Sequence, residues 1–568
     1  MTVLTRGAYA NPGTSLDFKT GNWRSTEKPA HIHAKAPCHG ACPAGEDQQA
    51  WFAKLQEGHV EAAWQELVSA NPLPAITGRV CPHPCETACN RVSLDGALAI
   101  HNVERWLGDE AITHGWAYPV AAPADDAPVV AIIGAGPAGI SAAYHCVRHG
   151  LRAVIYEMRP EAGGLLRSAI PRTRLPRDVV DGELRRVLAL PGITLKTRAR
   201  LGRDVMLEDL QRDYAAVLMA PGCQAGKEWS VGGAVPADLH EGLHTLQGFI
   251  DHGRLPEAKT VIVHGGGNTA VDLCRIWKRA GAEHVILVTA SGLPGPDTDP
   301  SDVLNIVPRE LEEALEEGIE IIDHATIDRL IMKGSSVTGV EVVSLRKLRG
   351  NDGRKHRVGF EGTERVISAD MVVPCIGEKV DAEGFERLVQ GSYFATQDRF
   401  GRLGDNIHAL GDARGDRGTV AAAIGDGRLA AAAVAAQAAG KGDPAEDIRV
   451  EMPASGLNPV YYPDIPRALV PKLPVAERND DTEIEGDIGH AAALAEAQRC
   501  MSCGNCLACD NCWTFCPDSA VIKTAELATD GSHYLFDLDY CKGCGLCAHE
   551  CPTGFIQMVP EDPANPAG

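Results

Sequence analysis

Short runs of apolar, β-branched residues alternate with helical segments through the middle of the chain. Val129-Val130-Ala131-Ile132-Ile133 predicts a buried strand of a parallel sheet. A helical run that ends near His149 follows it, and then a second apolar strand, Ala153 to Tyr156. The same order returns between Thr260 and Val288. Strand, helix and parallel strand form the βαβ unit, so the pattern predicts two α/β domains.

A glycine-rich turn, Gly134-Ala-Gly136-Pro137-Ala138-Gly139, joins the first strand to its helix. In a dinucleotide-binding turn the first glycine permits the bend, the second lets a pyrophosphate approach the backbone, and the third lets the helix pack on the strand. The helix N-terminus offers N–H groups to the phosphates. Glu157, which ends the second strand, can accept from the ribose hydroxyls and repel a 2′-phosphate. This order of elements predicts a dinucleotide site, against the alternative of a chance glycine turn.

The second unit has its own glycine turn, Gly265-Gly-Gly267-Asn268-Thr269-Ala270. Two such turns imply two dinucleotides, of which one is usually a bound flavin (FAD) and the other an exchanging nicotinamide. An NAD site usually carries an acid after the second strand and an NADP site an arginine, but Thr289-Ala290-Ser291 stands here. Basic residues of the helix could lie near a 2′-phosphate, so NAD and NADP both stay open; these residues are Arg275, Lys278 and Arg279.

Length and charge narrow the class of protein. A chain of 568 residues is too long for one core, so we expect three or more domains. A net charge of −22 argues against nucleic-acid binding and fits a soluble protein that docks on a more basic partner. No secretory leader is visible, and the alanine-rich run from Val420 to Ala439 carries polar residues, so a core helix is expected there and not a membrane span.

Nineteen cysteines in a chain without a leader indicate a reducing, cytoplasmic compartment and bound metal. Near the C-terminus the pattern Cys-x2-Cys-x2-Cys-x3-Cys-Pro occurs twice, which is the bacterial ferredoxin signature, where the fourth cysteine of each run binds the other cluster. Cys500 and Cys503 extend the spacing upstream and are interpreted as unligated thiols, with a shifted register as the alternative. The signature predicts two [4Fe–4S] clusters, one held by Cys506, Cys509, Cys512 and Cys551, the other by Cys541, Cys544, Cys547 and Cys516.

Five more cysteines lie near the N-terminus on two short, proline-bearing loops, after a lead-in of residues 1 to 36 that is expected to be irregular. They are Cys38, Cys42, Cys81, Cys85 and Cys89. Thiols that converge from separate turns suit an iron–sulfur cluster, with zinc as the competing interpretation.

Three elements of this segment resemble the N-terminal domain of the glutamate synthase small subunit, a domain that also opens dihydropyrimidine dehydrogenase. They are Asn71-Pro-Leu-Pro, Gly78-Arg-Val-Cys-Pro and Cys85-Glu-Thr-Ala-Cys. The resemblance implies a helical domain that holds two [4Fe–4S] clusters. It implies that one cluster is bound by Cys42, Cys81, Cys85 and the side chain of Glu104, and that Cys38 and Cys89 belong to the other.

The sequence departs from the family pattern at the second of these clusters. Two earlier cysteines are missing, and Ala30 and His33 stand at their spacings. His31 or His33 could substitute as a ligand, although a solvated loop histidine is the simpler account. Three clusters are therefore expected in the chain, and a fourth is left open.

The central domains resemble the two-domain flavoprotein oxidoreductases of the same family. Gly163-Gly164-Leu165 and Ile170-Pro-Arg-Thr-Arg174 are similar to the segment beside the flavin, Ala220-Pro-Gly222 is the crossing to the second domain, and Gly377 marks the return. The resemblance implies that Gly411-Asp412 lies at the ribityl chain, with Asp412 bonded to it. It also implies that the helix from Thr419-Val420 aims its N-terminus at the flavin ring.

Together these patterns predict an α/β fold with two Rossmann-like domains, in the manner of disulfide-reductase-like flavoproteins, between a helical Fe–S domain and a ferredoxin-like α+β domain. The expected boundaries are 1–120 for the helical Fe–S domain, 128–223 and 376–445 for the FAD domain, 224–375 for the NAD(P) domain, 446–497 for a linker and 498–568 for the ferredoxin-like domain.

The expected function is electron transfer between NAD(P)H, FAD, the clusters and a partner, either a catalytic subunit or a ferredoxin, in a hetero-oligomer. Reverse flow from a ferredoxin-linked 2-oxoacid oxidoreductase into NAD(P)+ is equally allowed, and no catalytic acid or base is expected because hydride transfer is direct. The alternatives are a glutamate synthase small subunit proper and a non-enzymatic assembly subunit. A flavin thiol-disulfide reductase would need a Cys-x-x-Cys in the central domains, and none occurs between Cys89 and Cys500.

Overall fold

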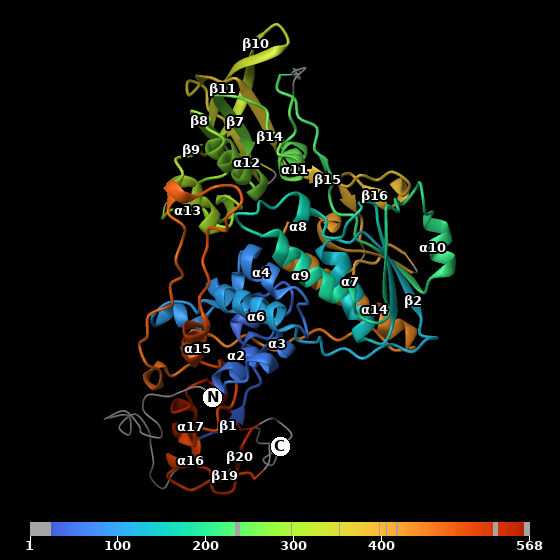
Figure 1. Ribbon diagram of the computed structural model, residues 1–568. Helices are drawn as coiled ribbons and strands as arrows, with labels where there is room; N and C mark the ends of the chain where they lie inside the picture. The colour runs from blue at the N-terminus through green and yellow to red at the C-terminus, as the bar shows by residue number, and fades with distance from the viewer. Residues whose placement is uncertain are drawn as a thin grey trace.

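Two parallel sheets form the middle of the molecule, one in each of two α/β domains (Figure 1). The computed structural model describes residues 24–232, 239–296, 298–351, 353–396, 398–404, 406–415, 418–525 and 532–561. The first sheet has the strand order β18-β5-β2-β3-β4, all parallel. Its strands are β2 (Val129–Ile133), β3 (Arg152–Glu157), β4 (Ile193–Thr197), β5 (Ala216–Met219) and β18 (Ile407–Ala409).

Helices cover this first sheet and confirm the predicted βαβ unit. They are α7 (Pro137–Arg148), α8 (Leu165–Ser168), α9 (Arg177–Leu188), α10 (Leu207–Asp213) and α14 (Val420–Ala438). The buried helix α14 packs along α7. Gly427 makes this close approach possible, because a Cβ there would lie 2.5 Å from the carbonyl oxygen of Ala138. Among the described residues, no helix combines the length and the apolar character needed to cross a bilayer.

The second sheet has the parallel order β14-β7-β8-β9 and lies at the opposite end of the molecule from the C-terminal module (Figure 1). Its elements are β7 (Thr260–Gly265), β8 (His284–Val288), β9 (Glu320–Ile322), β14 (Met371–Cys375), α11 (Gly242–His252), α12 (Asn268–Arg279) and α13 (Pro308–Glu316). An antiparallel sheet that the sequence patterns did not predict stands beside it, made of β10 (Ala325–Lys333), β11 (Ser336–Arg349), β12 (Lys355–Gly359) and β13 (Arg365–Ser368). A small antiparallel pair, β6 (Ala225–Gly226) with β15 (Glu378–Lys379), lies at the crossings between the domains. A second pair, β16 (Val389–Gln390) with β17 (Tyr393–Phe394), packs on the flavin domain.

The N-terminal domain is helical, as predicted. Four longer helices build its core, namely α2 (Gln48–Gln56), α3 (Val60–Leu67), α4 (Pro74–Val80) and α6 (Ile100–His114). Gly78 and Gly108 let α4 and α6 touch, since a Cβ at either would lie under 2.5 Å from a backbone atom of the other helix. The short helices α1 (Pro37–Ala41) and α5 (Pro84–Thr87) pack on each other and carry cysteines.

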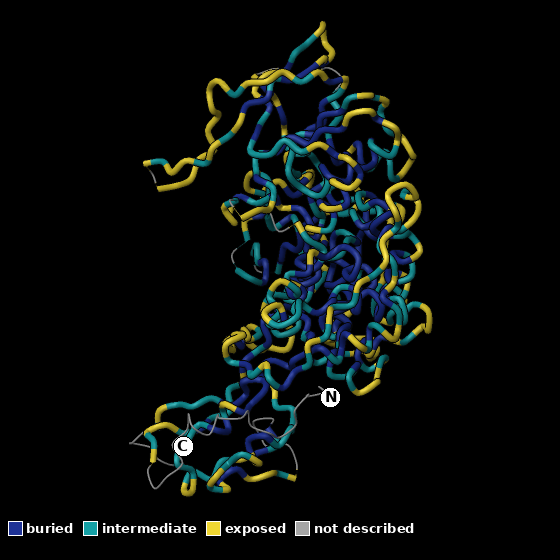
Figure 2. Tube along the Cα trace, turned by 90° about the vertical axis from the view of Figure 1, so that its left-hand side faces the viewer, coloured by how far each residue is buried: buried dark blue, intermediate teal, exposed yellow. Residues whose placement is uncertain are grey.

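The C-terminal module forms a separate lobe that contains both described ends of the chain (Figures 1 and 2). It consists of α16 (Asn511–Thr514), α17 (Leu546–His549), β19 (Val521–Lys523), β20 (Tyr534–Phe536) and β21 (Ile556–Pro560). The predicted irregular lead-in is wrong for one segment, because β1 (Glu27–His31) pairs antiparallel with β21. The first described residues therefore complete the sheet of the last domain.

The predicted linker is not a free connection. Residues 446–489 contain only short 3-10 turns, and α15 (His490–Arg499) follows them. Glu483 in this segment binds Arg79 at 2.8 Å and Arg105 at 3.1 Å in the helical domain. Lys472 binds Glu312 of the nicotinamide domain at 2.8 Å. The segment is thus bound to two domains by ion pairs before it reaches the C-terminal module.

Candidate functional site

One cavity of about 360 Å³ lies where the two α/β domains and the helical domain meet. All the residues predicted to bind FAD line it except Gly139. They are Gly134, Gly136, Pro137, Ala138, Glu157, Gly164, Leu165, Arg174, Ala220, Gly222, Gly411, Asp412, Thr419 and Val420.

The glycines of the first turn fit a dinucleotide in three different ways. Gly134 has φ +99°, and a Cβ there would lie 2.3 Å from the carbonyl oxygen of Ala220. Gly139 lies outside the cavity lining, and a Cβ on it would be 2.0 Å from the carbonyl oxygen of Gly134. A Cβ on Gly136 would meet no protein atom within 4 Å and would project into the cavity. No side chain caps α7 at Gly136, so its first N–H groups are available to a phosphate.

Two charged groups frame the cavity. The Glu157 carboxylate accepts from the backbone N–H of Ala135 at 2.7 Å and from that of Arg159 at 2.8 Å, which fixes its orientation at the end of β3. The Arg174 guanidinium binds the buried Asp272 carboxylate of α12 at 2.8 Å. Arg174 therefore lines the flavin cavity while it ties the flavin domain to the nicotinamide domain.

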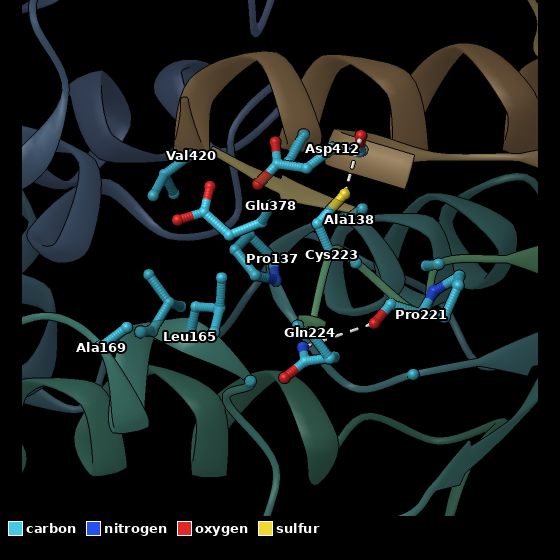
Figure 3. A pocket seen from close by; sticks show the side chains of 18 of the residues that line it. Pro137, Ala138, Leu165, Ala169, Pro221, Cys223, Gln224, Glu378, Asp412 and Val420 are labelled. Atoms are coloured by element: carbon cyan, nitrogen blue, oxygen red, sulfur yellow. Dashed lines mark hydrogen bonds between the residues drawn. The ribbon is translucent and has the colours of Figure 1, made fainter. Parts of the chain in front are cut away.

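Asp412 and Val420 lie across the cavity from Leu165 and Ala169 (Figure 3). Thr419 caps α14, since its hydroxyl oxygen accepts from the N–H of Ala422 at 3.2 Å. Sequence reasoning missed Cys223, whose thiol donates to the carbonyl oxygen of Asp412 at 3.4 Å.

Sequence reasoning also missed Glu378, whose side chain points into the flavin cavity (Figure 3). Both residues follow crossings between the domains, where no local sequence pattern marks a side chain as functional.

The nicotinamide turn reaches the same cavity through only two of its predicted residues, Asn268 and Thr269 at the start of α12. Gly267, like Gly136, has open space where a Cβ would be. The other predicted residues lie outside the lining and pack on structure: Gly265 against Cys375, Ala270 in the core of the domain, Thr289 against Gly266, and Gly377 near Lys227 with φ +100°.

The basic residues suggested near a 2′-phosphate are engaged elsewhere. Arg275 is buried and binds three carboxylates of α13 and its C-terminal end, Glu310, Glu313 and Glu317, at 2.7 to 2.9 Å. Arg279 binds Asp480 at 2.6 Å, and the Lys278 amine donates to the carbonyl oxygen of Glu283 at 3.3 Å. Ion pairs therefore occupy Arg275 and Arg279, while the partly exposed Lys278 donates a hydrogen bond to a backbone carbonyl.

A different cation stands at the end of β8. Arg357 of β12 donates to the hydroxyl oxygen of Ser291 at 2.9 Å and pairs with Asp302 at 2.6 Å. Lys347 of β11 lies 3.4 Å from the same Asp302 carboxylate. Arg357 thus places a partly exposed guanidinium beside the Ser291 hydroxyl. The hairpin that carries both cations is distant in sequence, so no local pattern signalled it.

The ferredoxin cysteines gather in the two sets that the signature predicted. Cys506, Cys509, Cys512 and Cys551 line one small cavity, and Cys516, Cys541, Cys544 and Cys547 line another. Positive φ values at Ala508 and Gly543 bend the backbone between paired cysteines. The fourth cysteine of each run lies with the other run, so the residues fit two [4Fe–4S] clusters.

Cys42, Cys81 and Cys85 gather around Glu104. Burial, then the neighbouring Cys42, Cys81 and Glu104, raise the pKa of Cys85. Burial raises the pKa of Glu104 to about 8. His83 lies 2.9 Å from the Glu104 carboxylate, and Asn71 and Thr77 donate to it.

A second buried carboxylate, Glu46, was not predicted. It accepts from the same Asn71 amide at 2.8 Å and lies near the Cys42 and Cys81 thiols, whose pKa values it helps to raise after burial. The set therefore holds three thiols and two candidate carboxylates. Val80 and Pro82, the neighbours of Cys81, line the flavin cavity, so this set borders the flavin site.

The histidines considered as substitute ligands contact an aromatic ring of the C-terminal module. His31 stacks on Phe555 with ring centroids 4.8 Å apart, and His33 contacts the same ring edge-on at 5.5 Å. Cys500 and Cys503, which the sequence analysis interpreted as unligated thiols, are neighbours of Cys38 and Cys89.

Comparison with known proteins agrees with this geometry. Residues 128–439 match the family described as pyridine nucleotide-disulphide oxidoreductase, which is more than half of the chain. The chain belongs to this family. Residues 31–116 match dihydropyrimidine dehydrogenase domain II, 4Fe-4S cluster, and residues 534–557 match a 4Fe-4S binding domain. The predicted fold and the FAD/NAD(P) and 4Fe-4S character of the domains are confirmed.

Relatives of known activity match most of the chain. The NADP(+)-dependent formate dehydrogenase subunit beta of Moorella thermoacetica is 31% identical over 87% of this chain and 73% of its own length. The NADPH-Fe(3+) oxidoreductase subunit beta of Geobacter sulfurreducens is 30% identical over 84% of this chain and 77% of its own length. The glutamate synthase [NADPH] small chain of Escherichia coli is 31% identical over 69% of this chain and 87% of its own length.

Proposed function

We propose that the chain is the NADPH-dependent electron-transfer subunit of a larger oxidoreductase. The observation that carries the proposal is that one cavity borders both a nicotinamide turn and a cysteine set. Asn268 and Thr269 line it on one side, and Val80 and Pro82 line it on another. When bound there, FAD accepts electrons in pairs from a nicotinamide and releases them singly, as [4Fe–4S] clusters require.

The chain's own residues bind and orient the two dinucleotides. The uncapped start of α7 offers N–H groups to the pyrophosphate, and the start of α14 directs its positive end toward the ring. The buried pair of Arg174 with Asp272 holds the two α/β domains together beside the cavity. Because a hydride passes directly between nicotinamide and flavin, the chain needs no acid or base at this point.

Two features support NADPH over NADH. The three relatives described above carry NADP or NADPH in their names. In this chain Arg357, with Lys347 behind it, gives the end of β8 the positive charge that a 2′-phosphate needs.

A partner protein is supported by the C-terminal module. Four large apolar side chains of this module are at least 47% exposed, namely Trp513, Ile522, Leu535 and Tyr540. Ile522 and Leu535 are cross-strand partners in the β19-β20 pair, and a contiguous exposed apolar surface is typical of a docking site. Two of the relatives are named as beta subunits, which supports a hetero-oligomer in which substrate chemistry takes place on another chain.

Anaerobic titration with NADPH and NADH, followed by the bleaching of flavin and cluster absorbance, tests this proposal. We expect NADPH to bleach both, and Arg357→Ala to raise the KM for NADPH by about tenfold, the loss of one charge-assisted hydrogen bond, with little change for NADH. Arg349→Ala, on the same hairpin, is the matched control and should change neither. A chain that neither nucleotide bleaches would refute the function, and equal KM changes for both nucleotides would refute the role of Arg357.

A further inference from the structure

We propose that Cys38, Cys89, Cys500 and Cys503 hold a fourth [4Fe–4S] cluster, whose ligands come in pairs from the two ends of the chain. The sequence patterns gave Cys38 and Cys89 no further thiolate ligands, and they assigned no role to Cys500 and Cys503. The site does not depend on the choice of nicotinamide or on the partner.

The four cysteines meet where the helical domain contacts the start of the C-terminal module. Cys500 is part of the same buried core against which Cys38 and Cys89 pack. Cys503 belongs to a second buried cluster, with Met452 and Tyr462, and Cys38 also packs against that one. Cys38 therefore contacts both groups, and the pairs from the two ends of the chain share one buried space.

Hydrogen bonds of the residues that follow Cys89 bring the two pairs together. Arg91 donates to the carbonyl oxygen of Arg499, the residue before Cys500, at 2.5 Å. Asn90 donates at 2.8 Å to the carbonyl oxygen of Met452, which belongs to the same buried cluster as Cys503.

The turn between Cys500 and Cys503 has the backbone geometry of the ferredoxin ligand turns. Ser502 has φ +49°, and the residues at the same place in the assigned turns, Ala508 and Gly543, have φ +52° and +70°. The left-handed region is uncommon for a serine and persists where the surroundings require it. The N–H of Gly543 donates to the sulfur of Cys541 at 3.4 Å, and the N–H of Ser502 bonds the thiol of Cys500 in the same way.

Hydrogen bonds and ion pairs to the helical domain hold this turn in place. Gln49 donates to the carbonyl oxygen of Cys503, and Arg91 donates to that of Arg499. Buried Arg499 also binds Asp95 at 2.9 Å. The fit is close, because a Cβ on Gly504 would lie 2.7 Å from the carbonyl oxygen of Ala34.

The N-terminal segment in which the family has two further cysteines has another role in this chain. Ala30, at the position of one of them, lies in β1 and pairs with Gln557 of β21. The segment is thus a strand of the C-terminal module, and the C-terminal pair Cys500 and Cys503 takes the ligand positions that it leaves.

The spacing bears on which metal fits. Four thiolates on one zinc ion would lie about 3.8 Å apart, given zinc–sulfur bonds of about 2.3 Å. Within the described residues, no group of three or more His, Cys, Asp or Glu side chains has the spacing to hold a single metal ion. A [4Fe–4S] cluster binds one thiolate at each of its four irons, so its four thiolates lie farther apart than those around a single metal ion.

Iron and acid-labile sulfide, measured per FAD on the anaerobically purified full chain, test the site. We expect about 16 of each, from four clusters, rather than about 12 from three. Cys38→Ala and Cys503→Ala should each lower the iron by about four and remove the same electron paramagnetic resonance signal of the reduced protein. The double variant should lose no more than either single variant, because both residues bind one cluster.

Met501→Leu, inside the same turn, and Cys146→Ala, in the core of α7, are matched controls and should keep about 16 irons. About 12 irons in the unchanged chain, stoichiometric zinc in place of four irons, or a double variant that loses about eight irons would overturn the proposal. If a single variant fails to fold, the iron and zinc content of the unchanged chain still decides between these outcomes.

Discussion

Gly136→Val separates the binding of FAD from the stability of the protein. A Cβ at this position meets no protein atom within 4 Å, so the new side chain fills only the cavity. Gly136 is the N-cap of α7. Valine is a poor N-cap, and its effect on the free energy of unfolding of the flavin-free protein should be about 1 kcal/mol.

The effect on FAD should be much larger. The two methyl groups of valine occupy the space through which a pyrophosphate reaches the N–H groups of α7. A hydrogen bond to a charged group contributes about 1.5–3 kcal/mol, so losing two of them costs about 3–6 kcal/mol. That corresponds to a rise in the FAD dissociation constant of roughly 10²- to 10⁴-fold.

The flavin content after purification and the dissociation constant of FAD from its fluorescence on reconstitution measure this effect. Thermal unfolding of the flavin-free proteins measures stability. Gly139→Ala is the contrasting control, because its Cβ would lie 2.0 Å from the carbonyl oxygen of Gly134 and should destabilise the fold with or without FAD. A Gly136→Val protein that binds FAD within threefold of the unchanged chain would refute the reasoning.

Three further experiments test the nicotinamide site, the path through the C-terminal module and the fourth ligand of the cysteine set around Glu104. Gly267→Val should keep FAD but abolish its reduction by NADPH while dithionite still bleaches it, since only the nicotinamide turn is filled; loss of FAD would mean that the two sites are reversed. Cys509→Ala should leave flavin reduction unchanged and stop delivery to a partner or ferredoxin, and unchanged delivery would place the C-terminal module off the path. Glu104→Ala should remove about four irons and Glu46→Gln none, and the reverse result would make Glu46 the fourth ligand.

The parts of the fold that sequence predicted are those fixed by local physics. The bend at Gly134 and the close packing at Gly139 depend on residues near them in the chain. The requirement for glycine at both positions is therefore visible in the sequence of the turn. The ferredoxin signature works for the same reason, since each run supplies three ligands from one loop.

The parts that sequence missed depend on contacts between distant segments. The strand Glu27–His31 is polar and contains a proline, and only its pairing with β21 makes it a strand. Arg275 was considered for a 2′-phosphate from its place on α12, but the glutamates of α13 bury it. The proposed partners Cys500 and Cys503 lie more than 450 residues from Cys38 in the chain, so spacing alone could not reveal them.

Two short helices link two of the cysteine sets: Cys42, Cys81 and Cys85 with Glu104 (the Glu104 set), and Cys38, Cys89, Cys500 and Cys503 (the shared set). Cys38 lies on α1 and Cys42 is the C-cap of that helix. Cys85 lies on α5, and Cys89 follows two residues after its end. The two helices pack together, and each carries or adjoins one cysteine of either set, so the two sets are neighbours.

The shared set is also next to the C-terminal module. Cys503 and Cys506 are three residues apart, and buried Tyr462 lies between their sets: after burial, Cys503 and Cys551 are the largest causes that raise the pKa of Tyr462. The Glu104 set borders the flavin cavity, so the shared set is what joins it to the ferredoxin sets. A cluster bound by Cys38 and Cys503, as proposed above, would therefore stand between the set that borders the flavin cavity and the two ferredoxin sets.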